Sequence, residues 1–319
     1  MGNSLTQRKR MYSFLGYAAL VLLAFFFLFP LLFMFTTTFK NDELTLQREL
    51  GGISGFLPAC AMVRPPDTAQ PERPLSQNPG ESADQFRERQ VSQMCASGTQ
   101  NYVDMTQRVQ FWRALFNSSL VVSLTVILGL IVNSMFAYAI ARIRFWGREA
   151  LITLVISLII IPFAAVAVPL LLLVNSFGWL DSYHVQIIPF AASAFSIYLF
   201  YQFFISLPKE LEEAAFVDGA SRFRTFWQIV LPLSGPVFAT VTVLQFLALW
   251  GNLLWPVMVV RGDTYATLPY VMQTFFGQAP RQWGDVMAFA LCATLPTLIL
   301  FLFFQRWFVR SVVSSGVKG

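Results

Sequence analysis

The sequence predicts an all-α membrane protein with six transmembrane helices. Hydrophobic residues make up 56% of the 319 residues and charged residues only 12%, about half the charged share of a soluble domain. Six uncharged apolar runs of 19–28 residues reach the length of about 20 residues that a helix needs to cross a bilayer. A soluble globule, a disordered chain and a nucleic-acid-binding domain are disfavoured by the same composition.

The six predicted spans are separated by polar or basic connections. They cover 14–35, 114–141, 150–174, 185–207, 233–260 and 286–304. The first run follows Arg8, Lys9 and Arg10, as in a signal peptide, but a leader has an apolar region of only about 7–15 residues. A retained anchor is therefore favoured over a cleaved leader. The chain then divides into a tail and first helix at 1–40, an extracytoplasmic segment at 41–113, a transmembrane core at 114–310 and a tail at 311–319.

The distribution of basic residues predicts the orientation. The N-terminus, the second-to-third and fourth-to-fifth connections and the C-terminus together carry twelve Lys and Arg, and the short connections on the other side carry two. Short loops rich in Lys and Arg stay in the cytoplasm. Both termini are therefore expected in the cytoplasm, and the net charge of +5 needs no nucleic-acid partner to explain it.

The outer segment 41–113 differs in composition from the rest of the chain. Its middle, 64–90, is rich in Pro, Gln, Ser, Glu and Arg, a composition that cannot bury much apolar surface. Cys60 and Cys95 both lie in this segment, in a compartment that permits disulfides. The two cysteines could form a Cys60–Cys95 disulfide or remain two unpaired thiols, and the disulfide is favoured.

The spans offer little catalytic or ion-binding chemistry. None of the six runs contains Asp, Glu, Lys, Arg or His, the groups that mark ion and proton pathways. Prolines interrupt several runs, which leaves broken helices or ordinary kinks as alternatives. They are Pro162, Pro169, Pro189, Pro256 and Pro296. Because the chain has no G-x-x-x-x-G-K-[ST] phosphate loop, no paired carboxylates and no metal-spaced cluster, we expect neither enzymatic activity nor a metal site.

The most specific feature is the cytoplasmic loop 208–232. Three glutamates stand where the first turn of a helix favours anions, and Leu211, Ala214 and Ala215 form an apolar stripe. Gly219 is a natural stop, and Ser221 can cap a second helix. Two short helices of this kind could lie on the lipid surface, but the small alanines favour docking into a groove on a partner.

The loop resembles the EAA signature of permease subunits in bacterial binding-protein-dependent ABC importers. The matching positions, at the spacing of that signature, are Glu213, Ala214, Ala215, Gly219, Ile229, Leu231 and Pro232. Four further stretches are similar to the carbohydrate-uptake branch: 117–120, 218–221, 250–256 and 267–269. The end of the chain resembles the tail of a maltose-type small permease, although Ser311-Val312 and Ser315-Gly316 depart from the usual Gly-Leu and Gly-Ala. The resemblance covers 1–40 and 100–319, so the Pro-rich stretch looks like an insertion.

The resemblance implies the five-helix core of a type I ABC importer, located in the bacterial inner membrane. The expected partners are a second permease, two copies of an ATP-binding subunit and an extracytoplasmic solute-binding protein, with ATP and Mg²⁺ held by the ATP-binding subunits. The resemblance also implies that the coupling element comprises the seven signature positions and Asp218. The connection 261–285 is expected to reach toward the solute-binding protein. The expected cargo is a sugar or a related polar solute.

A path for such a solute needs polar and aromatic side chains within the spans. The candidates are Asn133, Tyr138, Tyr198, Gln202, Gln245, Trp250 and Asn252. For each of them, hydrogen bonding between helices is an equally good explanation. Two other readings of the chain stay open: a self-contained secondary carrier with a coincidental loop, which would retain no ATPase partner, and an assembly or sensory protein, whose deletion would leave uptake intact.

Overall fold

The computed structural model describes residues 2–39, 82, 101–278 and 283–316, and every regular element in these ranges is helical. The Pro-rich insertion and the predicted Cys60–Cys95 pair lie outside the described residues. Two compact units are present, one formed by 1–109 with 274–293 and the other by 110–273 with 294–319. Each unit is described by itself.

The first unit contains α1 (Gly2–Thr37), a helical stretch at 101–108 and the beginning of α15 (Trp283–Gly316). The apolar side chains of α1 from Leu15 to Phe29 are exposed, as expected for a helix that faces an apolar environment. At its end, the Asn101 amide donates to the Thr38 carbonyl over 2.6 Å, and the Tyr102 hydroxyl donates to Thr38 Oγ1 over 3.1 Å. These two bonds fix the last turn of α1 to the stretch 101–108.

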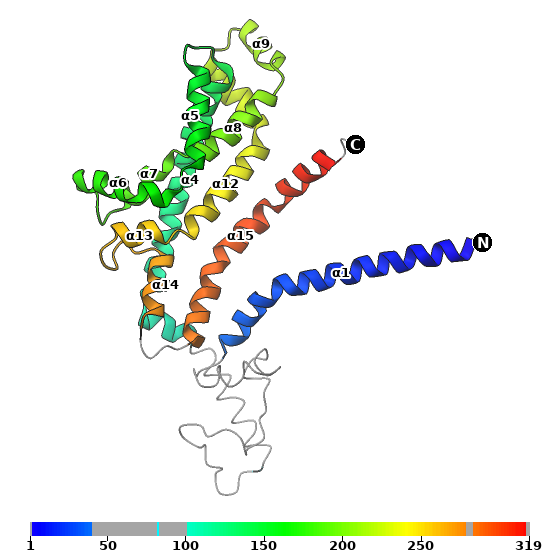
Figure 1. Ribbon diagram of the computed structural model, residues 1–319, viewed down its shortest axis with the longest axis vertical. Coiled ribbons are helices and arrows are strands. Elements are labelled where there is room, and N and C mark those ends of the chain that lie inside the picture. Colours follow the sequence, from blue (N-terminus) through cyan, green and yellow to red (C-terminus); the bar gives the residue numbers. More distant parts are fainter. Residues whose placement is uncertain (1, 40–81, 83–100, 279–282, 317–319) are drawn as a thin grey trace. The chain divides into compact units, whose positions relative to one another are not determined.

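The second unit is organised around α4 (Phe111–Arg142). Figure 1 shows α7 (Tyr183–Ala191), α8 (Ala194–Ser206) and α12 (Gly235–Trp250) beside it, and α5 (Arg148–Ile160) packs on α8. The small residues Ala137 and Ala141 of α4 are buried, and small residues let membrane helices approach closely. Dispersion between well-packed side chains therefore holds this bundle together.

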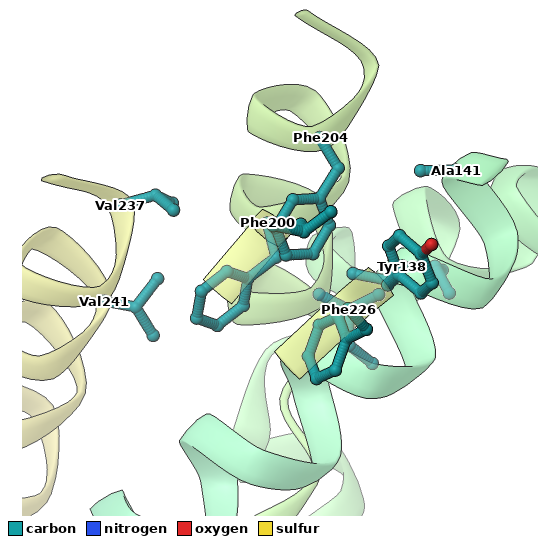
Figure 2. Packing of buried hydrophobic residues seen from close by; sticks show 11 residues of the cluster. Tyr138, Ala141, Phe200, Phe204, Phe226, Val237 and Val241 are labelled. Atoms are coloured by element: carbon teal, nitrogen blue, oxygen red, sulfur yellow. The ribbon is translucent and has the colours of Figure 1, made fainter. Parts of the chain in front are cut away.

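Aromatic rings fill the space between α4, α8 and α12. Phe200 and Phe204 stack with ring centroids 5.8 Å apart, and Tyr138 lies edge-on to Phe204 at 6.1 Å. Figure 2 shows these rings together with Phe226, which lies 5.0 Å from Tyr138. Because Phe226 belongs to the loop 208–232, this cluster joins the loop to the membrane helices.

Four described helices are long and apolar enough to cross a membrane, or six when each of two bent helix pairs counts as one span. The third predicted span, 150–174, is broken, which is one of the two alternatives left open for Pro162: α5 ends at Ile160, α6 (Phe163–Ser176) follows, and the two are bent by 103°. The break lies at Ile161 and Pro162, which are both extended. A proline disfavours helical backbone in the residue before it, so Pro162 ends α5.

The predicted fourth and fifth spans are also interrupted. Residues 192 and 193 separate α7 from α8, and Ala192 is extended. The fifth predicted span, 233–260, is divided: α12 stops at Trp250, and α13 (Leu254–Val259) follows after a break. Glycine at 251 lowers the helix propensity there, and the Asn252 Oδ1 atom accepts a hydrogen bond from the Trp255 amide of α13.

Candidate coupling site and solute pathway

The first helix of the loop is α9 (Glu210–Val217), with Glu210, Glu212 and Glu213 in its first turn. The helix ends at Val217, and the turn after it contains Gly219, whose φ of +78° is left-handed and whose Cβ position would meet nothing within 4 Å. The requirement for glycine is therefore conformational. The Ala220 amide donates to the Ala215 carbonyl over 2.9 Å, which closes the turn.

The apolar stripe predicted on α9 is mostly unburied. Leu211 is 42% exposed, Val217 is 88% exposed, and Ala214 is exposed, whereas Ala215 is buried at 6%. Glu213 and Asp218 are exposed as well. Ala215 therefore packs against the bundle, and the remaining predicted coupling residues of this helix form a free surface within the described chain.

The second helix of the loop is divided. Ser221 caps α10 (Arg222–Thr225) by accepting from the Arg224 amide, and a π-helical turn, η3 (Phe226–Val230), and α11 (Leu231–Leu233) follow. Phe226 and Val230 are buried. Of the signature residues here, Ile229 and Leu231 are half-buried and Pro232 is exposed. A π-turn of this kind is often found at functional sites.

A buried ion pair, which the sequence analysis did not predict, attaches α9 to α4. Glu212 is 7% exposed, and its Oε1 atom lies 2.8 Å from Arg142 Nε. The Tyr138 hydroxyl donates to Glu212 Oε2 over 3.1 Å. Tyr138, a pathway candidate, is therefore bonded to the loop 208–232. The pattern that could have singled out Glu212 is its i, i+3 relation to the buried Ala215, which places both on one face.

Two other pathway candidates bond to the break between α7 and α8. The Asn133 amide donates to the Ala191 carbonyl over 3.1 Å, and Asn133 Oδ1 accepts from the Ser193 amide over 2.9 Å. Gln245 donates to the Phe190 carbonyl over 3.4 Å. A broken helix in a membrane is tolerated where neighbouring side chains satisfy its freed backbone groups, so these contacts explain both polar residues structurally.

The structure brings Trp250 and Asn252 together at a small cavity of about 20 Å³, which Gln186, Ser118 and Thr267 also line. A cavity of this volume has room for about one water. Both residues are half-buried, and Trp250 stacks on Phe246 with centroids 5.1 Å apart. The remaining candidates do not join them: Tyr198 is half-buried and Gln202 is exposed, both on α8.

Two of the stretches that resemble the carbohydrate-uptake branch, 117–120 and 267–269, meet near the N-terminal end of α4. The Asn117 amide donates to the carbonyls of Thr264 and Ala266 over 3.0 and 2.9 Å. Ser118 Oγ accepts from the Leu268 amide over 2.7 Å. Residues at 117–120 therefore hold the connection after α13 in a fixed conformation.

A second buried ion pair lies within the first unit. Arg108 Nη1 is 2.8 Å from Asp285 Oδ2, and the Asp285 side chain is fully buried. Arg108 also lies over the Phe275 ring at 5.3 Å. The sequence placed Asp285 one residue outside the sixth predicted span, but α15 begins at Trp283 and contains it. In the described part of the chain, no group of three His, Cys, Asp or Glu residues could hold a metal ion.

The second unit is a bundle of apolar helices, several of them interrupted, with a two-helix loop at one end. This architecture defines a multi-pass membrane permease. Residues 125–314 match the family described as the binding-protein-dependent transport system inner membrane component, and the chain belongs to this family. It is a permease subunit of a transporter that works with a binding protein.

Relatives of known name agree with this assignment. The arabinooligosaccharides transport system permease protein AraQ of Halalkalibacterium halodurans is 34% identical over 67% of this chain and 77% of its own length. The sn-glycerol-3-phosphate transport system permease protein UgpE of Yersinia enterocolitica is 37% identical over 64% and 74%. One chain of a bacterial ABC transporter involved in the import of the acidic polysaccharide alginate has the same fold, with a TM-score of 0.70 and 20% identity over 94% of this chain and 97% of its own.

Proposed function

We propose that the chain is one permease half of an ATP-driven importer for a carbohydrate or a related polar solute. The proposal that ATP drives the importer is supported by the exposed apolar surface of α9, which is formed by Leu211, Ala214 and Val217. A short helix with a small residue at the centre of its exposed face fits a groove on a partner. The partner is an ATP-binding subunit, which binds ATP and Mg²⁺ and hydrolyses the nucleotide.

The remaining predicted coupling residues serve this contact in different ways. Glu213 and Asp218 flank the exposed surface of α9, Gly219 sets the turn, and Ala215 packs the helix against the bundle. Ile229, Leu231 and Pro232 continue the loop toward α12. The excess of Lys and Arg in the short loops on this side supports a cytoplasmic location for α9 and for both chain termini.

The proposal of a carbohydrate-like solute rests on the relatives and on the aromatic and polar side chains of Trp250 and Asn252. The names of the relatives refer to arabinooligosaccharides and sn-glycerol-3-phosphate, and the alginate transporter imports an acidic polysaccharide. All three are polar, hydroxyl-bearing solutes. Trp250 and Asn252, both half-buried near the break after α12, offer an aromatic face and an amide for contact with such a solute. An extracytoplasmic binding protein delivers the solute to the two permeases, and the connection 261–285 faces that protein.

The docking assignment is tested by co-expressing the chain with its second permease and the ATP-binding subunit and purifying the complex in detergent. We expect Ala214→Asp, which places a charge on the exposed face of α9 without burying it, to remove the ATP-binding subunit from the complex. The matched control is Trp146→Asp, because Trp146 is fully exposed in the turn before α5. It should retain the subunit. A wild-type chain that retains no ATP-binding subunit but still takes up solute would identify a secondary carrier instead.

A further inference from the structure

Only two residues of α9, Glu212 and Ala215, are buried. Ala215 contributes a single methyl group to the packing. Both carboxylate oxygens of Glu212, in contrast, face side chains of α4: Oε1 faces Arg142 at 2.8 Å, and Oε2 accepts from Tyr138 at 3.1 Å. The attachment of α9 to the bundle therefore depends mainly on Glu212.

Arg142 extends this attachment to a third helix. It is the last residue of α4, and its Nη2 atom donates to the carbonyl of Leu207, the C-cap of α8, over 2.7 Å. The side chains of Arg142 and Glu212 are only 7% and 9% exposed. One guanidinium group thus joins the cytoplasmic ends of α4 and α8 to α9.

A buried ion pair is well suited to transmit movement between helices. Desolvated charges cannot separate without leaving an unpaired charge in a medium of low dielectric constant, so the pair resists opening. Tyr138 is itself fixed between Phe204 and Phe226. By comparison, the sequence connection from α9 to α12 passes through the left-handed turn at Gly219 and the π-helical turn η3.

We propose that Arg142 and Glu212 are positioning residues that make α9 and the cytoplasmic end of α4 one rigid body. A displacement of α9 then enters the membrane directly through α4, in addition to the path along the chain into α12. This inference rests on the proposed function of α9 as the contact for an ATP-binding subunit.

The first test measures solute uptake per ATP hydrolysed by the complete transporter in proteoliposomes with its binding protein. Glu212→Gln keeps the shape of the side chain and removes its charge. We expect it to lower this ratio about tenfold, while the amount of assembled complex is unchanged. Glu210→Gln is the matched control, since Glu210 lies exposed on the same helix, and it should keep the wild-type ratio. A wild-type ratio for Glu212→Gln would overturn the proposal.

Glu212→Gln leaves the Arg142 charge unpaired, so the chain could be lost from the membrane. The double variant Arg142→Gln with Glu212→Gln removes both charges and should restore the amount of protein. The ratio is then measured on the double variant, where the proposal again requires a loss of about tenfold. A double variant that transports with the wild-type ratio would show that the ion pair serves folding alone.

A second test measures the rigid body itself, in the wild-type transporter. Spin labels are placed at Glu210 and Arg144, which are both exposed, in a background without other cysteines. In the wild type we expect one narrow distribution of the distance between the two labels, and the same distribution without nucleotide and with bound ATP. In the Glu212→Gln variant we expect a broader distribution. A shift between the two nucleotide states in the wild type would overturn the proposal. Absence of the ATP-binding subunit from the wild-type complex would instead overturn the proposed function.

Discussion

Replacing Asn133 by leucine is expected to destabilise the bundle at the break between α7 and α8. Asn133 is fully buried, and its side-chain amide bonds two backbone groups across this break, the Ala191 carbonyl and the Ser193 amide. Leucine has nearly the same shape as asparagine but offers neither a donor nor an acceptor. The substitution therefore leaves both backbone groups without these bonds and adds no cavity.

The expected magnitude follows from the two lost hydrogen bonds. Hydrogen bonds between membrane helices average about 0.6 kcal/mol and reach about 1.7 kcal/mol, and leaving a buried backbone group unsatisfied costs about 1–3 kcal/mol. Two such bonds together contribute about 2 kcal/mol. For a domain of this size, about 2–4 °C of melting temperature is lost per kcal/mol, so the Asn133→Leu variant should melt about 4–8 °C lower.

The assay is thermal denaturation of the detergent-solubilised chain, followed by fluorescence-detected size-exclusion chromatography. Asn175→Leu is the matched control, because Asn175 is exposed on α6, and its melting temperature should equal that of the wild type. Asn133 was also a candidate for the solute path. An unchanged melting temperature combined with impaired uptake would refute the structural role and return Asn133 to the path.

Substitutions at three further positions test other contacts. Gly219→Val should abolish uptake because a β-branched residue is strained at positive φ. Gly219→Asn should retain most of the uptake, because asparagine tolerates this conformation. Equal uptake by the two variants would contradict the conformational role of Gly219. Arg108→Met leaves the Asp285 carboxylate buried without its cation and should cost about 3 kcal/mol of stability. The loss is measured by thermal denaturation, with Arg113→Met as the control because Arg113 is exposed. Trp255→Phe removes the indole donor that bonds a backbone carbonyl at 2.8 Å and should cost about 1 kcal/mol in the same assay, with a loss below about 0.3 kcal/mol counting against it.

The length and composition of the apolar runs were sufficient to predict helices and their order, because crossing a bilayer imposes a strict length requirement. The cap at Ser221 and the stop at Gly219 were also predicted correctly, since both depend on local backbone chemistry. The bend at Pro162 was left open between a kink and a break. Proline alone does not decide between them, because neighbouring helices determine whether freed backbone groups are satisfied.

The tertiary role of the charged residues could not be predicted in the same way. Arg142 was counted as an orientation signal and Glu212 as one of three acids in a first helical turn, and each interpretation fits its local sequence. Their pairing joins positions seventy residues apart, and no local pattern specifies such a contact. The same is true of Arg108 and Asp285. Buried ion pairs are therefore the part of this fold that required the structure.

The polar residues of α4 provide the strongest constraint on where a solute could pass. Asn117 bonds the connection at 264–266, Asn133 bonds the break between α7 and α8, and Tyr138 bonds Glu212. Each of these three side chains is engaged with a different element of the second unit. Because breaking such buried bonds costs free energy, α4 acts as a frame for its neighbours. Under the proposed function, we therefore expect contacts to the solute from other elements, such as the break after α12 with Trp250 and Asn252.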